Sequence, residues 1–426
     1  MTTMKRPVNV ARAAGSGASV PIECCQACAH APLENVLSLG YMPPVNQVVA
    51  AGTPPRQQPW FPTDLLYCAR CELVQLGLAV DPVIIFPPEY PYTSGTTRLL
   101  RDNFADLYSE ARAMLALSER DLVIDIGSND GTLLASFKNG GQRTLGIEPT
   151  DVGKIAASRG IATLQRYFTP QVAEEVRRAH GPARVVTAAN CFAHIEDVHS
   201  IIDGILYLLG PDGMFISESH YLIGLIERLQ YDTVYHEHLR YYSLRSLANL
   251  LQMHGLEVFH ARLIPTHGGS IRVYAARRSE RPVNDSVKTL LAAEPQGDAM
   301  RARLAAFRRE VMLSKLRLLT AVRDLKESGA HICGISAPSR ASTLVNYVGL
   351  DADIIDYVCE IAGSLKIGKL MPGTAIPVVE ESRLFTDQPD CAIVFSWHIA
   401  DELAPKLRAK GYRGKLLSPL PTPREI

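Results

Sequence analysis

One apolar run that ends in a glycine-bearing loop constrains the fold of this 426-residue chain more than any other feature. Leu122–Ile126 is apolar apart from Asp125, and it is followed by Gly127-Ser-Asn-Asp-Gly131 and then by the apolar helix start Thr132-Leu-Leu. Glycines let a backbone approach a ligand closely, and the first turn of a helix presents unpaired N–H donors. The pattern therefore predicts a strand, a ligand-binding loop and a helix within a parallel α/β sheet.

The next predicted strand ends at Glu148, about twenty residues after the loop, where an acid can accept hydrogen bonds from both hydroxyls of a ribose. A dinucleotide site would need Gly-x-Gly-x-x-Gly, whereas this loop reads Gly-x-x-x-Gly, and its acidic side chain would repel a pyrophosphate. The loop favours a cationic cofactor without a phosphate, S-adenosylmethionine. The alternative is an ordinary turn of any α/β protein. The expected cofactor contacts are Asp125, Gly127, Asn129, Asp130, Gly131 and Glu148.

Strand-like and helix-like runs alternate through much of the chain, which predicts βαβ units. The strands of a first unit are expected at 122–126, 144–148, 184–188 and 214–218, and those of a second at 332–335, 354–358, 391–395 and 415–418. Between them, residues 301–326 contain no Gly or Pro and favour a long helix. We expect a disordered tail (1–20), a zinc-binding domain (21–90), a cofactor-binding domain (91–284), a helical connector (285–328) and a C-terminal α/β domain (329–426).

Composition excludes several classes of partner. The 44 Lys and Arg residues balance 44 Asp and Glu residues, so nothing indicates a surface for nucleic acid or acidic membranes. We find no apolar run of about 18 residues, and the first twenty residues lack the apolar centre of a signal peptide. We therefore expect a cytoplasmic protein, a monomer or homodimer, that acts on a small molecule.

Four of the nine cysteines form two pairs, Cys25-Gln-Ala-Cys28 and Cys68-Ala-Arg-Cys71. Four thiolates suit tetrahedral zinc and leave no open position, so this site would be structural rather than catalytic. Cys24 could replace Cys25 as a ligand. Four unrelated buried cysteines are the alternative, and a redox role is disfavoured because neither pair opens a helix after a strand.

The densest polar segment is Tyr231-Asp-Thr-Val-Tyr235-His-Glu-His238. Its histidines, glutamate and tyrosines can exchange protons near neutral pH, and the segment follows the last core strand of the cofactor sheet. His236 and His238 would not share a helical face, and His-Glu-x-x-His is absent, which weakens a metalloprotease interpretation. A polar helix face with a satisfied histidine is the alternative. Two further candidates are His194, just past a strand end, and the turn His267-Gly-Gly-Ser270.

The chain resembles the sugar C-methyltransferases of deoxysugar pathways, which act on nucleotide-linked 4-keto sugars. The resemblance runs from about Glu23 to the C-terminus. It implies a fold of three parts: a zinc-binding domain, a class I methyltransferase domain and a C-terminal Rossmann-like α/β domain, the last two clasping the substrate. The motifs that carry it are the two Cys-x-x-Cys pairs, Tyr90-Pro-Tyr92-Thr-Ser, Asp125-x-Gly-x-Asn-Asp-Gly131, Asn190-x-x-Ala-His194, Tyr235-His-Glu-His238, Tyr241-Tyr-Ser243, His267-Gly-Gly-Ser270 and Asn346-Tyr-x-Gly349.

The resemblance also implies a mechanism without a catalytic metal. The 4-ketone acidifies the neighbouring C3 proton, His238 removes it, and the enolate attacks the methyl group on sulfur. Tyr235 and Glu237 position the base or the sugar, and donors aimed at the enolate oxygen lower the barrier. Those donors would be His194 and Tyr90 or Tyr92. The resemblance adds Asn190 as a cofactor contact, and as substrate contacts Tyr241, His267, Gly268, Ser339, Arg340 and Asn346.

The sequence departs from that family at Ser336-Ala-Pro-Ser-Arg340-Ala-Ser-Thr343, where the family has Gly-Ala-Pro-Ala-Lys-Gly-Asn-Thr. Arg340 keeps the charge of lysine but not its geometry, and Ala341 restricts backbone approach. Glu360-Ile-Ala-Gly-Ser-Leu-Lys366 stands where the family has Asp-x-Asn-Pro-x-Lys. These changes bear on the nucleotide and the sugar. Two alternatives stay open: methylation of an oxygen or nitrogen, and a zinc-ribbon binding protein with an inert methyltransferase domain, which the intact cofactor loop argues against.

Overall fold

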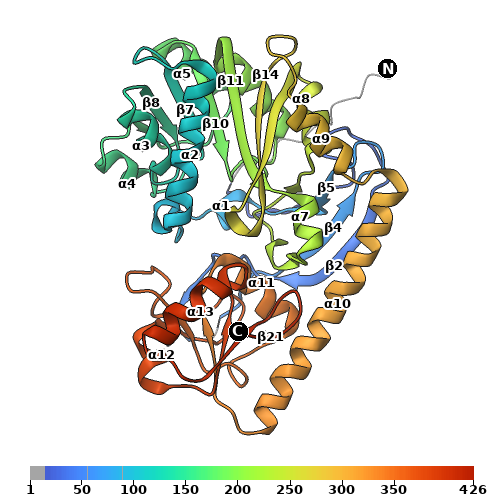
Figure 1. Ribbon diagram of the computed structural model, residues 1–426, viewed down its shortest axis with the longest axis vertical. Helices are drawn as coiled ribbons and strands as arrows, with labels where there is room; N and C mark the ends of the chain where they lie inside the picture. The colour runs from blue at the N-terminus through green and yellow to red at the C-terminus, as the bar shows by residue number, and fades with distance from the viewer. Residues whose placement is uncertain (1–14, 55, 89) are drawn as a thin grey trace.

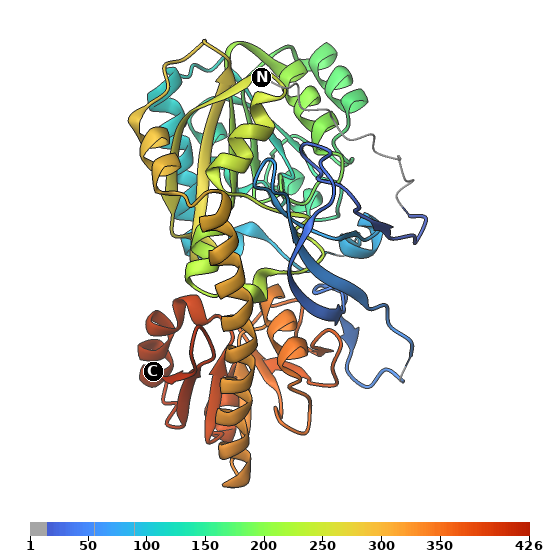
Figure 2. The same ribbon diagram turned by 90° about the vertical axis from the view of Figure 1, so that its right-hand side faces the viewer.

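A 31-residue helix, α10 (Gly297–Glu327), runs along one side of the molecule and connects two α/β units (Figure 1). The computed structural model describes residues 15–54, 56–88 and 90–426. Because α10 carries no Gly or Pro after its first residue, it forms one continuous rod, which is upright in Figure 2. The buried apolar residues that hold it along one face are Met300, Leu304, Phe307, Val311, Leu318 and Val322.

The larger α/β unit contains a seven-stranded sheet in the order β13-β14-β11-β10-β7-β8-β9. β7 to β11 are parallel, and β14 is antiparallel to both of its neighbours. The expected βαβ pattern is therefore confirmed, with one antiparallel strand added. The strands are β7 (Leu122–Ile126), β8 (Arg143–Ile147), β9 (Thr163–Leu164), β10 (Ala183–Ala189), β11 (Leu209–His220), β13 (Leu256–Ile264) and β14 (Ser270–Arg277).

Helices cover both faces of this sheet, so alternate residues of its strands pack into two separate hydrophobic clusters. Val123 packs in one cluster with side chains of α2 (Arg98–Leu115), α3 (Thr132–Asn139) and α4 (Gly153–Ser158). Leu122 and Ile124 pack in the other cluster. The helices of that second face are α5 (Pro170–His180), α6 (Val198–Leu208) and α8 (Leu244–Gln252). Doubly covered parallel strands explain why these segments read as continuous apolar runs.

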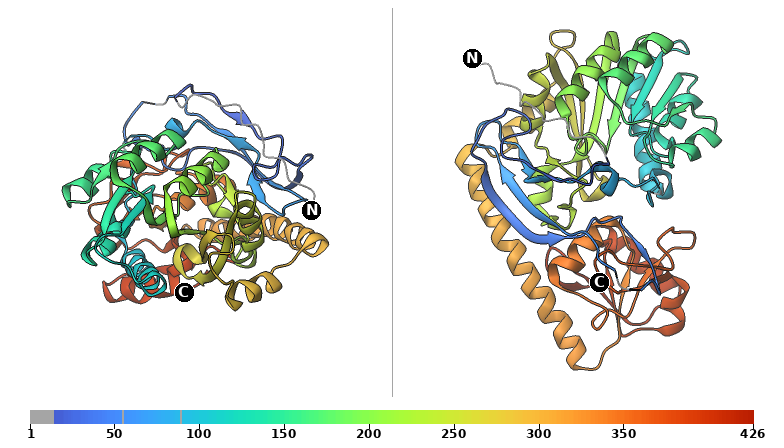
Figure 3. Two further views of the ribbon diagram at one scale, coloured as in Figure 1. Left: turned by 90° about the horizontal axis from the view of Figure 1, so that it is seen from above. Right: turned by 180° about the vertical axis from the view of Figure 1, so that it is seen from behind.

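The N-terminal segment contributes three strands to a four-stranded antiparallel sheet in the order β12-β5-β4-β2. The fourth strand, β12 (Arg240–Tyr241), comes from the middle of the chain and pairs with β5 (Val74–Leu76). The long strands β2 (Glu34–Met42) and β4 (Phe61–Tyr67) lie beside α10 (Figure 3). The remaining short elements are β1 (Val20–Pro21), β3 (Val49–Ala50), β6 (Leu78–Ala79) and α1 (Pro82–Ile85).

The C-terminal unit has a six-stranded sheet in the order β18-β16-β15-β19-β20-β21, parallel except at β21. The chain leaves β15 toward β16 and later returns to β19 on its other side. The carboxyl ends of β15 and β19 are therefore the topological switch point of this sheet, a position where open α/β sheets commonly bind ligands. The strands of this sheet are β15 (Ile332–Ile335), β16 (Val358–Glu360), β18 (Val378–Glu380), β19 (Cys391–Val394), β20 (Lys415–Ser418) and β21 (Arg424–Glu425), and the helices are α11 (Ser339–Val348), α12 (Ser382–Asp387) and α13 (Ala400–Ala409). The short strand β17 (Lys369–Leu370) pairs instead with β3 of the N-terminal segment.

One expected strand is wrong over most of its length. Residues 354–357 precede β16, and a turn occupies the start of the expected range. The N–H groups of Asp353 and Ile354 donate to Asp351 Oδ1 at 3.1 and 3.2 Å, an alternative to strand pairing that aspartate side chains often offer. The strands expected at 122–126, 332–335 and 415–418 are confirmed without change.

The expected disordered tail falls mainly on residues 1–14, which lie outside the described residues. The N–H groups of Gly15 and Gly17 donate to the buried carboxylate of Asp81 at 3.0 and 2.6 Å. Within the described part of the chain, no helix combines the length and the apolar character that crossing a membrane requires.

Candidate active site and metal site

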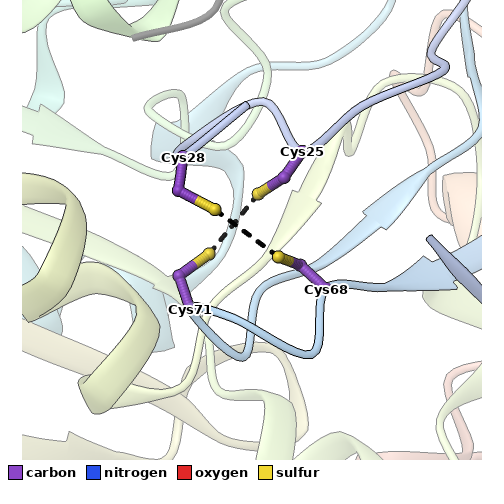
Figure 4. A group of neighbouring side chains, drawn as sticks. All are labelled: Cys25, Cys28, Cys68 and Cys71. Carbon is purple, nitrogen blue, oxygen red and sulfur yellow. Dashed lines mark hydrogen bonds between the residues drawn. The ribbon is translucent and has the colours of Figure 1, made fainter. Parts of the chain in front are cut away.

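The four paired cysteines converge on one point (Figure 4). Their sulfur atoms all lie within 4.8 Å of one another, with Cys25 Sγ 3.4 Å from Cys71 Sγ and Cys28 Sγ 3.5 Å from Cys68 Sγ. Tetrahedral zinc with Zn–S bonds of about 2.3 Å separates its sulfurs by about 3.8 Å, so the group fits zinc. Cys24 is not a member of the group, and all nine cysteines are free thiols.

Two matching turns create this arrangement. In each turn the N–H of the residue after the second cysteine donates to the carbonyl of the first: Ala29 to Cys25 and Glu72 to Cys68, both at 2.9 Å. Ala29 and Glu72 both have positive φ angles, 56° and 63°. The two turns thereby aim all four sulfurs inward, and the resulting site is fully buried.

The expected cofactor loop lies at the carboxyl end of β7, beside the start of α3. Asp125 is buried and accepts a hydrogen bond from Thr187 Oγ1 at 2.6 Å, while its burial raises its pKa to about 7. Gly127 has φ +69°, and a Cβ there would stand 2.7 Å from the Cβ of Cys191. Glycine is therefore required both for the backbone angle and for the packing of the loop against the end of β10.

Glu148 fixes the tip of this loop. Its Oε2 accepts from the N–H of Asn129 at 2.9 Å, and its Oε1 accepts from the N–H and hydroxyl of Thr150 at 2.9 and 2.6 Å. A carboxylate has about four acceptor positions, so this arrangement leaves room for one further hydrogen bond. Two ribose hydroxyls, as expected from the sequence, would need one of these protein contacts to be replaced.

Asp130 and Asn129 fasten the loop to the segment after Tyr92. Asp130 Oδ2 accepts from the N–H of Gly95 at 3.1 Å and from Arg159 at 3.2 Å. Asn129 Oδ1 accepts from the N–H of Ser94 at 2.8 Å. Asp130 is therefore turned toward the protein. Asn190, the remaining expected cofactor contact, is half-buried with φ +60° at the end of β10, and its N–H donates to Glu218 O.

The donor set of the loop fits a cationic, phosphate-free cofactor such as S-adenosylmethionine. Helix α3 begins at Thr132 after the N-cap residue Gly131, and the N–H of Thr132 donates to Asp130 Oδ1 at 3.3 Å. Asp125 and Glu148 supply buried carboxylates beside it. Arg159 is the basic side chain at the loop, and it pairs with Asp130.

His238 lies at the centre of a cluster of aromatic rings. Its ring centre is 4.2 Å from that of Tyr235 and 4.9 Å from those of His194 and His220. Its Nδ1 lies 2.8 Å from the carbonyl oxygen of Thr233, which can only accept, so Nδ1 carries the proton. The Nε2 atom is then an unprotonated acceptor. Burial, with added repulsion from His267 and Arg340, lowers the pKa of His238 to about 4, so the ring is neutral at neutral pH.

The segment around His238 is not a helix, so the alternative of a polar helix face is wrong. Only Tyr231–Thr233 (η2) form a helical turn, of the 3₁₀ type, and the following residues form an irregular turn. Neighbouring side chains consequently point in different directions. His236 contacts Thr63 Oγ1 at 3.0 Å and Pro62 O at 3.2 Å on β4, a structural contact with the N-terminal sheet.

The side chain of Glu237 points in a third direction, to the point where the N-terminal segment, the larger α/β unit and the C-terminal unit meet. Asn46 Nδ2 donates to its Oε1 at 2.7 Å, and Tyr90 OH donates to its Oε2 at 2.8 Å. Ser339 at the start of α11 donates to Asn46 Oδ1 at 3.0 Å. Burial raises the pKa of Glu237 to about 7, although these two donors and the charge of Lys366 act in the opposite direction.

Three of the expected catalytic groups make ring contacts near this cluster. His194 stacks on Phe86, with ring centres 5.7 Å apart, as well as facing His238. Tyr90 lies 6.5 Å from Tyr92, measured between ring centres. The sequence motifs that were separated along the chain are thus brought together around His238 and Glu237.

Several residues expected to contact the substrate contact the protein in this structure. The hydroxyl of the buried Tyr241 donates to Thr233 O at 3.3 Å, and Asn346 Nδ2 donates to Pro372 O at 2.9 Å. The Gly268 carbonyl accepts from Arg228 and from Gln230. His267, with φ +55°, instead presents its ring to His220 at 5.4 Å.

The structure adds residues that the sequence analysis missed: Asn46, His220, Asp232, Lys366, Trp397 and His398. Asp232 lies within the dense polar segment and could have been noted there. His220 lies two residues after the strand expected at 214–218. Asn46, in contrast, sits in a Pro-rich stretch that carries no signal of its contact with a residue 191 positions away.

Comparisons with known proteins assign families to consecutive parts of the chain. A model of the methyltransferase domain matches residues 97–261, and a model of the C-methyltransferase C-terminal domain matches residues 265–421. A model of a zinc binding domain matches residues 25–86. Together the three models cover the two α/β units and the cysteine site.

One relative matches almost end to end. The C-methyltransferase NovU of Streptomyces niveus is 32% identical over 410 residues, 95% of this chain and 97% of NovU. Among solved structures, an S-adenosylmethionine-dependent methyltransferase from Clostridium acetobutylicum ATCC 824 is 11% identical over 43% of this chain and 93% of its own, with a TM-score of 0.34. Another, from Anabaena variabilis ATCC 29413, is 16% identical over 42% of this chain and 86% of its own, with a TM-score of 0.33.

Proposed function

Because this chain belongs to the C-methyltransferase family, and so is an S-adenosylmethionine-dependent enzyme with a zinc site, we propose that it methylates the carbon beside the ketone of a nucleotide-linked 4-keto deoxysugar. One observation supports the chemistry above all others. His238 donates its Nδ1–H to a backbone carbonyl, which leaves a neutral, half-buried ring with a vacant Nε2 lone pair. Such a group can remove a proton from carbon near neutral pH.

The loop from Gly127 to Gly131, together with Asp125 and Glu148, would hold the cofactor. S-adenosylmethionine, when bound, supplies an electrophilic methyl group on a sulfonium, for which the enolate carbon is the nucleophile. The acidic character of Asp125 and Glu148 suits a cationic ligand. The expected contact with Asn190 at the end of β10 belongs to the same proposal.

His238 would take the proton at Nε2. The C–H bond breaks, its electron pair moves into the enolate, and the ring becomes an imidazolium that still donates Nδ1–H to Thr233 O. With a pKa of about 4 in the protein without substrate, His238 is a weak base by itself. The enolate next to the new imidazolium stabilises the charged ring, because an opposite charge within a few ångströms favours the ionised form.

Neutral donors would stabilise the enolate oxygen. Burial raises the pKa of Tyr90 and of Tyr235 well above the usual range, so both keep their O–H protons at neutral pH. His194 is neutral because burial lowers its pKa. Donors held in place before the reaction lower the barrier without reorganisation. Tyr90 would have to leave Glu237 to act in this way, and Tyr92 is the more exposed alternative.

The substrate would lie between the histidine cluster and the C-terminal unit. Its sugar would lie near His238 and His267, and its nucleotide at the carboxyl ends of β15 and β19. The topological switch point of an open α/β sheet is where ligands commonly bind. Ser339, the first residue of α11, follows β15 closely in the chain.

The test is incubation of the zinc-loaded protein with S-adenosylmethionine and a panel of nucleotide-linked 4-keto sugars. The proposal expects a product one methylene heavier, with the new methyl carbon bonded to the carbon beside the ketone by NMR. A methyl group found on oxygen or nitrogen would replace the proposal by heteroatom methylation. The absence of any product, combined with no binding of S-adenosylmethionine at millimolar concentration, would favour a non-catalytic protein.

A further inference from the structure

A buried ion pair joins the C-terminal unit to the segment that carries His238. Arg340 on α11 donates to both oxygens of Asp232, from Nε and from a terminal nitrogen, each at 2.7 Å. The indole N–H of Trp397, three residues after β19, donates to the same carboxylate at 2.7 Å. The side chains of Arg340 and Asp232 are 7% and 1% exposed, so little water screens the pair.

Asp232 is the middle residue of η2, and its neighbours extend the contact in both directions. Tyr231 packs its ring against Tyr347 of α11, with ring centres 5.2 Å apart. Thr233, on the other side, supplies the carbonyl that accepts the Nδ1–H of His238. The C-terminal unit therefore contacts Tyr231 and Asp232 directly, and Thr233, the third residue of η2, accepts the hydrogen bond from the proposed base.

We propose that the Asp232–Arg340 pair is an interdomain clamp that fixes the orientation and tautomer of His238. Arg340 and Asp232 are thus positioning residues, which act through Thr233 and do not touch the reacting atoms. The importance of the clamp for catalysis rests on the proposed function, in which His238 is the base. Its effect on the ring of His238 follows from the contacts alone.

The geometry explains why an arginine suits this position. The planar guanidinium fork donates to both oxygens of Asp232 from two nitrogens at once, a geometry that a single ammonium nitrogen does not match. The same group lies 4.9 Å from the ring centre of Trp397, and it contacts His267 O at 3.4 Å and His398 Nδ1 at 3.3 Å. Its positive charge is neutralised by Asp232, so Arg340 is not a free cation for a substrate phosphate.

The tautomer of His238 can be measured without a substrate. The zinc-loaded, full-length protein is labelled with 15N-histidine, its long-range 1H–15N spectrum is recorded, and His238 is assigned with the variant His238→Gln. The wild type is expected to show one neutral tautomer with the proton on Nδ1. In Asp232→Asn and in Arg340→Met this single signature is lost and replaced by a mixture that includes the Nε2–H form, while Arg340→Lys falls between them.

A control variant breaks another arginine–carboxylate pair between distant parts of the chain, one that is solvent-exposed. Arg301 donates to both oxygens of Glu34 at 2.9 to 3.1 Å, and its other contacts, with Asp298 and Tyr67, lie outside η2. Arg301→Gln is expected to leave the His238 signature unchanged. Thermal melting and zinc content verify that each variant is folded.

An unchanged His238 signature in folded Asp232→Asn and Arg340→Met would overturn the clamp. If those two variants do not fold, Arg340→Lys decides, since a wild-type signature in that variant has the same meaning. Loss of the signature in Arg301→Gln as well would also refute it, because the effect would then not be specific. The proposed function fails separately, when His238→Gln still transfers methyl groups at the wild-type rate.

Discussion

Asn46 donates to Glu237 at 2.7 Å across 191 positions of the chain, so a residue of the N-terminal segment fixes a carboxylate next to the proposed base. Asn46 lies between β2 and β3, in the N-terminal segment that also carries the cysteine site. We therefore expect zinc, by stabilising this segment, to support the contact with Glu237.

Removal of zinc should lower both stability and activity. We expect one zinc ion per chain, and we expect Cys68→Ser to lose it and to lower the melting temperature, because small domains derive much of their folding free energy from a structural metal. Cys24→Ser is the control, since Cys24 lies outside the group of four. Zinc content by mass spectrometry and thermal melting provide the readout, and equal zinc loss in the two variants would refute the assignment.

Glu237 should make stability depend on pH. Its pKa is about 7 in the folded protein and near 4.5 in the unfolded chain. Between these values the folded protein binds the extra proton, so stability falls as pH rises through this window. The variant Glu237→Gln lacks this titrating carboxyl, so its free energy of unfolding should not fall over this window. The free energy of unfolding of the variant minus that of the wild type should therefore increase by about 3 kcal/mol from pH 4.5 to above pH 7. Urea unfolding at several pH values measures the difference, and a constant difference would contradict the assigned pKa.

Gly127→Ala should weaken cofactor binding. The new Cβ would stand 2.7 Å from Cys191 Cβ at a φ of +69°, so the loop must move. Gly255→Ala is a matched control with a φ of +80° and open space around the new Cβ. Both substitutions should cost roughly 1 kcal/mol of stability from the backbone angle. Only Gly127→Ala should reduce S-adenosylmethionine affinity, by about tenfold or more, as measured by calorimetry.

Much of the fold could be predicted because it depends on local patterns. The apolar runs of β7 and β15 are buried strands, β20 is a strand at the expected residues, and the two cysteine pairs form one group. The strand expected at 354–358 failed because the side chain of Asp351 satisfies the backbone there. A side chain that competes for local N–H groups is hard to weigh against an apolar run.

The site could be predicted only as a set of residue types. His236 and His238 look equivalent in the sequence, yet one packs on β4 and the other donates to Thr233 O. The difference comes from an irregular turn that is held by β12 on one side and by Arg340 on the other. Those partners lie far away in the chain, so local patterns do not reveal them.

Deuterium exchange tests the central claim most directly. A nucleotide-linked 4-keto deoxysugar is incubated in D₂O with the protein but without S-adenosylmethionine, and the proton beside the ketone is followed by NMR. We expect the wild type to catalyse its exchange and His238→Gln to do so roughly 10² to 10⁴ times more slowly, the usual contribution of a general base. The variant should bind S-adenosylmethionine as the wild type does. Exchange by His238→Gln at the wild-type rate would show that His238 is not the base, and no exchange by the wild type with a substrate that it methylates would contradict the enolate mechanism.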